Sequence, residues 1–336
     1  MNHRVATFSG GVTILASLLL LLPIGVPPAR AQEQLREERL RELLVAAYSL
    51  RRRGQFQAAA TAYEELLRKV ANKDAKRILA REAAELFVTM GRPRDAVAIY
   101  RRNHDLRREI DTLLAMDDPK GAKDALTISR YVRYPRGEVL ALSKLGQHEE
   151  ALARATASED LGRERGDVLM ELGRYREAAT AYGQAREYLL RARALSKAGL
   201  VEEAKSAYRD AIARLRLSLR DPQGSLQRVR RIKAKYEEAP DGLTRERARL
   251  ALAKAYGLLA RDYRRLAEAY AGSGEPGERA KAAKLAANAL KFYRKRKELL
   301  EDRVGGGDAY GAKIVADEGL DRLIEEVRAE AERYRG

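Results

Sequence analysis

The feature that most constrains how this chain can fold is a short motif that recurs between residues 54 and 211. The motif has a glycine, an alanine five residues later and, in most copies, a tyrosine four residues after the alanine. Glycine ends a helix readily, because it takes the left-handed conformation without a Cβ clash. The alanine then lies inside a second helix and allows close approach, and the tyrosine lies one turn further along the same face. The motif therefore predicts a repeated αα-hairpin.

Five copies share this frame, which makes a plain alanine-rich bundle the weaker alternative. They are Gly54, Ala59 and Tyr63; Gly91, Ala96 and Tyr100; Gly146, Ala151 and Ala155; Gly173, Ala178 and Tyr182; and Gly199, Ala204 and Tyr208. The frame resembles the tetratricopeptide repeat (TPR) over about residues 40 to 215. The resemblance implies an all-α solenoid, a TPR-like right-handed superhelix, that acts as a scaffold for protein partners.

The spacing of the motifs departs from the standard TPR. Gly146 and Gly173 are 27 residues apart and Gly173 and Gly199 are 26 apart, against about 34 in the standard unit. Tryptophan is absent from the chain, and the closing proline of the repeat is mostly missing. A degenerate copy, with its turn at Asp117-Asp118 followed by Ala122 and Leu126, fits between the copies at Gly91 and Gly146. We therefore expect shorter helices than in an ordinary TPR array.

The first 31 residues have the pattern of a secretory signal peptide. A short basic start precedes an apolar run from Val12 to Leu22, which is followed by prolines and by Ala29-Arg30-Ala31. This order predicts cleavage after Ala31 and export, in a bacterium to the periplasm. An uncleaved anchor is the alternative. No cysteine follows the run, so a lipoprotein anchor is not expected.

Three parts are therefore predicted: a signal peptide (1–31), a TPR-like array (32–215) and a basic helical region (216–336). In the third part, we expect a basic helix over Ser225–Glu238 and a long hairpin of Thr244–Ala271 and Glu278–Arg303. A capping helix is expected over Ala316–Tyr334. The alternating segment from 214 to 219 is interpreted as the end of the preceding helix.

The sequence offers no catalytic or metal-binding pattern. Cysteine is absent, and His104 and His148 are the histidines left after the signal. The glycines at 305–307 lack the Lys-Ser or Lys-Thr sequel of a phosphate loop, no Gly-x-Ser-x-Gly elbow occurs, and the Glu-Ser motif of soluble lytic transglycosylases is missing. We expect no enzyme activity, no cofactor and no small-molecule substrate.

The resemblance to TPRs also implies a concave face built from the first helix of each repeat. Counting back from each glycine by the family's frame selects Tyr48, Arg51, Arg52, Arg81, Glu85, Arg136, Lys144, Arg193 and Lys197. This set is mainly positive and suggests an acidic peptide or protein segment, bound by charge-assisted hydrogen bonds.

A formal net charge of +17 is concentrated in two later clusters. They contain Arg228, Arg230, Arg231, Lys233 and Lys235, and Arg294, Lys295, Arg296 and Lys297. Such clusters can bind nucleic acid, but export argues against that partner. Three interpretations stay open: an acidic protein partner, an anionic membrane or cell-wall polymer, and a solvated basic surface.

Overall fold

The computed structural model describes residues 29–335 apart from 117, 222, 241 and 303–305, and side chains from residue 36 onward. The chain divides into two compact units, Met1–Leu43 and Leu44–Gly336. In the first unit the described part is helical from Ala29, so the expected cleavage site lies in the first turn of that helix. The rest of the predicted signal lies outside the described residues. Within the described ranges there is no strand, and no helix is both long and apolar enough to cross a membrane.

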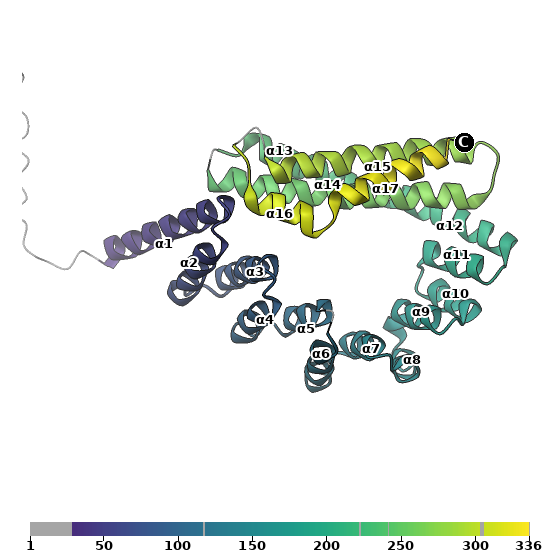
Figure 1. Ribbon diagram of the computed structural model, residues 1–336, viewed down its shortest axis with the longest axis horizontal. Helices are drawn as coiled ribbons and strands as arrows, with labels where there is room; N and C mark the ends of the chain where they lie inside the picture. The colour runs from purple at the N-terminus through teal and green to yellow at the C-terminus, as the bar shows by residue number, and fades with distance from the viewer. Residues whose placement is uncertain (1–28, 117, 222, 241, 303–305, 336) are drawn as a thin grey trace, which may run out of the picture. The chain divides into compact units, whose positions relative to one another are not determined.

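Residues 44–220 form a series of short antiparallel helices (Figure 1). These are α1 (Ala29–Arg52), α2 (Phe56–Lys69), α3 (Lys73–Thr89), α4 (Pro93–Arg102), α5 (Leu106–Ala115), α6 (Pro119–Tyr131), α7 (Pro135–Lys144), α8 (His148–Thr156), the 3₁₀ turn η1 (Glu159–Leu161), α9 (Gly162–Glu171), α10 (Tyr175–Gln184), α11 (Tyr188–Lys197) and α12 (Val201–Arg220). The expectation of short helices is confirmed, because several span ten residues. The degenerate copy is also confirmed as the hairpin α5–α6.

Many of the turns between these helices share one geometry, whereas α2 and α5 end at the extended residues Val70 and Met116. At Gly173 φ is +72°, its N–H donates to the carbonyl of Met170, and the next N–H donates to Leu169. This is the Schellman motif. The same pair of bonds closes the turn at Arg186, where φ is +58° although the residue is not glycine. Turns both within and between hairpins therefore use a left-handed residue.

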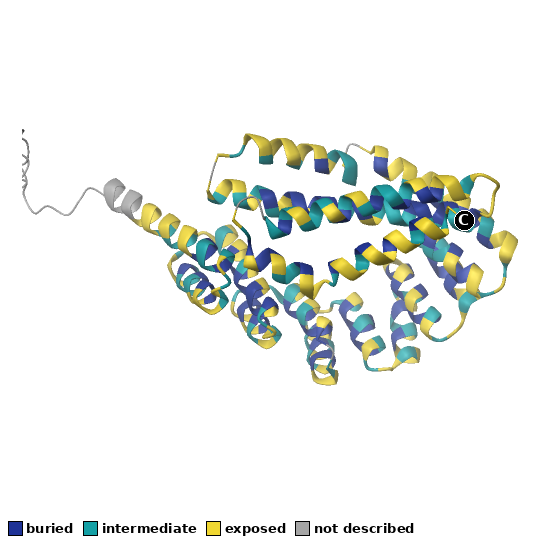
Figure 2. Ribbon diagram, turned by 45° about the horizontal axis from the view of Figure 1, so that its top comes forward, coloured by how far each residue is buried: buried dark blue, intermediate teal, exposed yellow. Residues whose placement is uncertain are grey.

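The motif alanines and tyrosines form the core of the array, as the sequence predicts. Ala59 and Ala178 are fully buried, and Tyr63 and Tyr182 are almost fully buried. The ring of Tyr182 packs against the backbone of Gly166, where an added Cβ would lie 2.5 Å from it. Figure 2 shows this pattern as buried stripes where consecutive helices meet. Burying each large side chain contributes about 2 kcal/mol.

The C-terminal region is a bundle of longer helices built on α14. It consists of α13 (Ser225–Glu238), α14 (Leu243–Ser273), α15 (Glu278–Glu301), α16 (Ala309–Asp317) and α17 (Leu320–Arg333). Both α13 and α15 pack on α14, and α17 packs on α15. The basic helix is confirmed at its predicted bounds. The two helices of the long hairpin begin and end within two residues of the prediction at each described end. Residues 214–219 are confirmed as the end of α12.

The expected capping helix over 316–334 is wrong at its start. Gly319 has φ of +57° and separates α16 from α17. The apolar stripe of Leu320, Ile324 and Val327 is buried against α15 in the expected way. The helix that carries this stripe, α17, therefore begins after Gly319.

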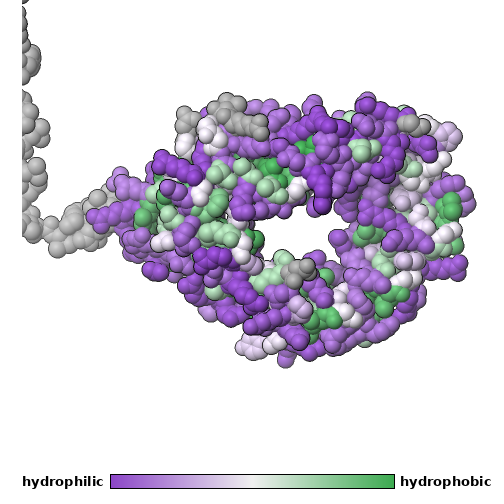
Figure 3. Space-filling model, viewed as in Figure 1, coloured by the Kyte–Doolittle hydropathy of each residue, from purple (hydrophilic) through white to green (hydrophobic). Residues whose placement is uncertain are grey.

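The second unit closes on itself, because α16 packs against its first hairpins. The Cβ of Ala309 lies 3.2 Å from the position of a Cβ at Gly54. The rings of Phe56 and Tyr310 meet edge to face with centroids 6.4 Å apart. The space-filling view shows an opening enclosed by helices of this unit, with both hydrophilic and hydrophobic residues at its edge (Figure 3).

Candidate binding sites

The first three residues predicted for the concave face lie in the closure, which is the region where α16 and the chain just before it pack against the first hairpins. Tyr48 and Arg51 are buried, and the Arg51 guanidinium lies between the rings of Tyr48 and Tyr310, 4.2 and 4.5 Å from their centroids. Arg52 donates to Asp302 at 2.5 Å and to the carbonyl of Gly307 at 3.0 Å. The structure thus differs from the open groove expected at this repeat, because the chain's own C-terminal helices cover it.

A buried ionic network holds this closure. Arg249, which is 3% exposed, donates to both carboxylate oxygens of Glu246, at 3.1 and 2.7 Å, and to Asp308. It also donates to the carbonyls that end α15. Asp308 in turn caps α16 by accepting the N–H of Tyr310 at 3.0 Å. One arginine therefore connects α14, the end of α15 and the start of α16.

Beside the network lies an open cavity of about 570 Å³. It is lined by residues of α1, α3, α4, α14, α15 and α16, and it brings together four of the predicted concave residues, Tyr48, Arg51, Arg81 and Glu85. Burial of the phenol, and then the charge of the nearby Glu82, raise the pKa of Tyr48 to about 12. The sequence thus selected one wall of this cavity, and the other wall comes from the C-terminal helices.

The remaining predicted concave residues are exposed and do not join this cavity. Arg136 forms an ion pair of 2.8 Å with Glu164. Arg193 makes two bonds of 2.5 Å to Glu268 of α14. Lys144 is exposed on α7, and Lys197 lies over the ring of Tyr175 with its amine 5.6 Å from the centroid. The ion pairs offset much of the positive charge expected on this face.

The basic cluster of α13 lies at the surface. Arg228, Arg230, Arg231, Lys233 and Lys235 are all exposed. Lys233 pairs with Glu237 at 2.9 Å, and Arg231 donates to Gln223. In the described part of the chain, the other three make no ion pair within 4.0 Å.

The basic cluster of α15 does not form one patch. Arg296 pairs with Glu318 at 2.6 Å, and Lys297 pairs with Asp321 at 2.5 Å, so α16 and α17 neutralise them. Arg294 is exposed, and the amine of Lys295 lies 5.6 Å from the centroid of Tyr256. Within this cluster, Arg294 is therefore the exposed cation, and Lys295 is half-buried beside it.

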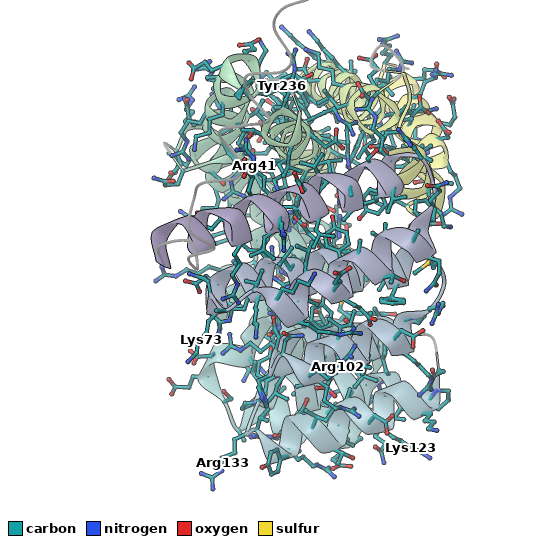
Figure 4. The ribbon with its side chains drawn as sticks, turned by 90° about the vertical axis from the view of Figure 1, so that its left-hand side faces the viewer. Arg41, Lys73, Arg102, Lys123, Arg133 and Tyr236 are labelled. Atoms are coloured by element: carbon teal, nitrogen blue, oxygen red, sulfur yellow. The ribbon has the colours of Figure 1, made fainter. Side chains whose placement is uncertain are left out.

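The two basic helices border a groove over α14 of about 670 Å³. Leu252, Tyr256 and Leu299 supply apolar surface, and Tyr236 of α13 adds an aromatic edge. Figure 4 shows Tyr236 at the C-terminal helices, remote from the turn residue Arg133. The lining also includes four cations of the two clusters, Lys233, Arg294, Lys295 and Lys297, together with the acids Glu237, Glu298, Glu301 and Asp302. Sequence reasoning found the cations, but it did not find the groove between them.

Sequence reasoning also missed the acidic partners that define the closure. Glu246, Asp302 and Asp308 lie about 200 or more residues from the arginines of α1. No local pattern distinguishes them from the solvated carboxylates of other helices. Within the described ranges, no group of three or more His, Asp or Glu residues is placed to hold a metal ion.

Consecutive hairpins with this frame make the array an all-α repeat solenoid. The chain has a TPR-like fold. No protein-family profile and no curated protein sequence matches it. A tetratricopeptide repeat protein from Parabacteroides merdae is a similar solved structure, with 12% identity, a TM-score of 0.24, and coverage of 87% of this chain and 98% of its own.

Two further solved structures show comparable similarity. The TPR domain of P58(IPK) is 14% identical, with a TM-score of 0.23 and coverage of 88% of this chain and 93% of its own. A chain of Naa15/Naa10 bound to HypK-THB is 14% identical, with a TM-score of 0.21 and coverage of 88% and 64%. The repeat type is assigned from the hairpins of this chain itself.

Proposed function

We propose that this chain is an exported TPR-like scaffold that binds an acidic protein segment in the groove between α13 and α15. The observation that supports this proposal is the combination of an apolar floor, at Leu252 and Tyr256, with exposed cations on both rims. Charge on the rims attracts and orients an acidic segment. The floor accepts its apolar side chains in the manner of a helix-in-groove interface.

The rims carry cations beside acids of the same chain, so the unpaired cations are the ones that an acidic partner would meet. The cations of the lining are Lys233, Arg294, Lys295 and Lys297, and its acids are Glu237, Glu298, Glu301 and Asp302. Arg294 lines the groove from α15, and Arg230 lies three residues before the lining residue Lys233 on α13; both are exposed and make no ion pair in the described residues. By contrast, Arg136 and Arg193, which were predicted for the concave face, are already paired. An acidic partner therefore gains more from the groove than from the inner face of the array.

The proposal can be tested with a fluorescein-labelled designed helix that carries glutamates on one face and leucines on the other. We expect salt-sensitive binding, because exposed charges are screened as ionic strength rises. Reversing charge at Arg230 and Arg294 together (R230E/R294E) should weaken binding at least tenfold. Lys123→Glu, which reverses an exposed charge on α6, is the matched control. Equal binding by the double variant and the parent would contradict the proposal.

A second candidate is docking on an anionic membrane or cell-wall polymer. The observation that favours it is the run of exposed arginines and lysine along one side of α13, at Arg228, Arg231 and Lys235. Sedimentation with phosphatidylglycerol vesicles tests it. Vesicle binding that needs these three residues but tolerates R294E would favour this candidate over the groove.

Export is proposed from the N-terminal pattern. Expression of the full chain in a bacterium, followed by fractionation and N-terminal sequencing, should give a periplasmic protein that begins at Gln32. A cytoplasmic protein that retains Met1 would exclude export by this signal, while leaving the groove proposal untouched.

A further inference from the structure

The cavity inside the closure has features that the scaffold function does not use. Its walls come from α3 on one side and from α14 and α16 on the other. Its volume of about 570 Å³ lies within the range of small-molecule sites. It is also separate from the groove, which is lined by α13, α14 and α15.

The cavity contains apolar surface that is not covered by the protein. Ile78 and Val88 of α3 are 51% and 49% exposed, although both line the cavity. Leu250 of α14 and Ile314 of α16 line it as well. An apolar body placed here would remove this surface from water and gain about 25 cal/mol for each Å² covered.

The same cavity carries cations that lack a close acidic partner. Arg51 lines it with its side chain 5% exposed, and its Nη2 makes no hydrogen bond, with the nearest Glu246 oxygen 3.8 Å away. Arg81 and Lys254 line it from α3 and α14 and make no ion pair among the described residues. Arg51 adds positive charge behind the cavity wall, and the exposed Arg81 and Lys254 are the cations that a bound anion would contact directly.

Most acids around the cavity are already engaged. Glu82 accepts the hydroxyl of Tyr48 at 2.5 Å and lies 3.4 Å from Arg247. Glu318 pairs with Arg296, and Asp317 pairs with Lys313. Glu85 is the exception among the lining acids: it lies near Arg81 and Lys254 without an ion pair to either among the described residues, and burial raises its pKa. The available positive charge therefore exceeds the available negative charge.

We propose that this cavity binds a small organic carboxylate with an apolar body. The carboxylate would contact Arg81 and Lys254, with Arg51 adding positive charge behind them, and the apolar part would lie along Ile78 and Val88. Because α3 and α16 both line the site, such a ligand binds the closed form and stabilises it by mass action. Loading of the cavity would thus be coupled to closure of the second unit.

The test uses decanoate, with decanol and acetate as comparators, in isothermal titration calorimetry below the micelle concentration. Decanoate should bind at least tenfold more tightly than decanol, which lacks the charge, and than acetate, which lacks the body. It should also slow hydrogen exchange of the α16 amides. Equal affinities for decanoate and decanol would overturn the proposal, as would decanoate binding that leaves α16 exchange unchanged.

A second experiment uses variants at exposed positions, which take no part in the buried ionic network around Arg249. Arg81→Gln and Lys254→Gln should each weaken decanoate binding about fivefold, and Glu85→Gln should tighten it by removing a like charge. Val88→Trp should block the site. Lys123→Gln is the control of matched exposure, and circular dichroism establishes that each variant folds. Unchanged affinity in both Arg81→Gln and Lys254→Gln would also overturn the proposal.

Discussion

The buried pair between Arg249 and Asp308 allows a quantitative test of what holds the closure. Asp308 is 1% exposed at its side chain and Arg249 is 4% exposed. Asp308→Asn removes the negative charge but keeps an oxygen that can accept the N–H of Tyr310. The substitution therefore separates the ionic role of Asp308 from its role as the cap of α16.

Breaking a buried pair by removing one partner costs about 3 to 5 kcal/mol, because the other charge stays buried. Arg249 keeps its two bonds to Glu246, so we expect the lower end, about 3 kcal/mol. At 1.4 kcal/mol for each tenfold change, this corresponds to about a hundredfold faster exchange of the α16 amides. Asp308→Ala also removes the cap and should cost about 1 kcal/mol more.

The assay is native-state hydrogen exchange, with thermal unfolding followed by circular dichroism. Asp317→Asn is the matched control, since it lies on the same helix and is half-exposed in a pair with Lys313. It should change stability by less than about 0.5 kcal/mol. If Asp308→Asn leaves α16 exchange within twofold of the parent, the ionic network does not hold the closure and the reasoning fails.

Three further predictions follow from the packing and the charges. Gly166→Ala should destabilise by about 1 to 3 kcal/mol in urea unfolding, because its Cβ would clash with a tyrosine ring. Gly183→Ala should instead stabilise by about 0.5 to 1 kcal/mol, because its Cβ would meet the Arg191 side chain at an ordinary contact distance of 3.6 Å. The pKa of Tyr48 is raised to about 12, so its contribution to stability is complete below pH 10 and is lost as pH rises toward 12; Tyr48→Phe should flatten unfolding free energy over that window. Arg193→Glu should weaken the contact between α11 and α14, and adding Glu268→Arg should restore it, as a double-mutant cycle in thermal unfolding would show.

The repeat was predictable because its signal is local. A glycine that ends one helix and an alanine that opens space in the next fall within a few residues, so five copies define the frame. The turns at His104, Arg133 and Arg186 were not predictable, although they have positive φ like the glycines. The sequence does not mark a non-glycine residue that adopts a positive φ, since the surrounding fold imposes this conformation on it.

The candidate sites were predictable only in part for the same reason. Counting from the glycines found Tyr48, Arg51 and Arg81 on one wall of the cavity. It could not find the opposite wall, because pairs such as Arg52 with Asp302 join residues 250 positions apart. The sequence also did not indicate that Glu318 and Asp321 neutralise Arg296 and Lys297 of the α15 cluster, since both acids lie beyond a chain reversal.

The contact of α16 with the first hairpins has a consequence for how this chain can change in length. An open solenoid tolerates gain or loss of a repeat, because each unit touches only its neighbours. Here Arg52 of α1 must meet Asp302 and the carbonyl of Gly307. Inserting one hairpin would displace α1 from these partners, so duplication or deletion within the array should be disfavoured. The number of repeats is therefore set by the length of the C-terminal helices, because these helices connect the last hairpin of the array to the first.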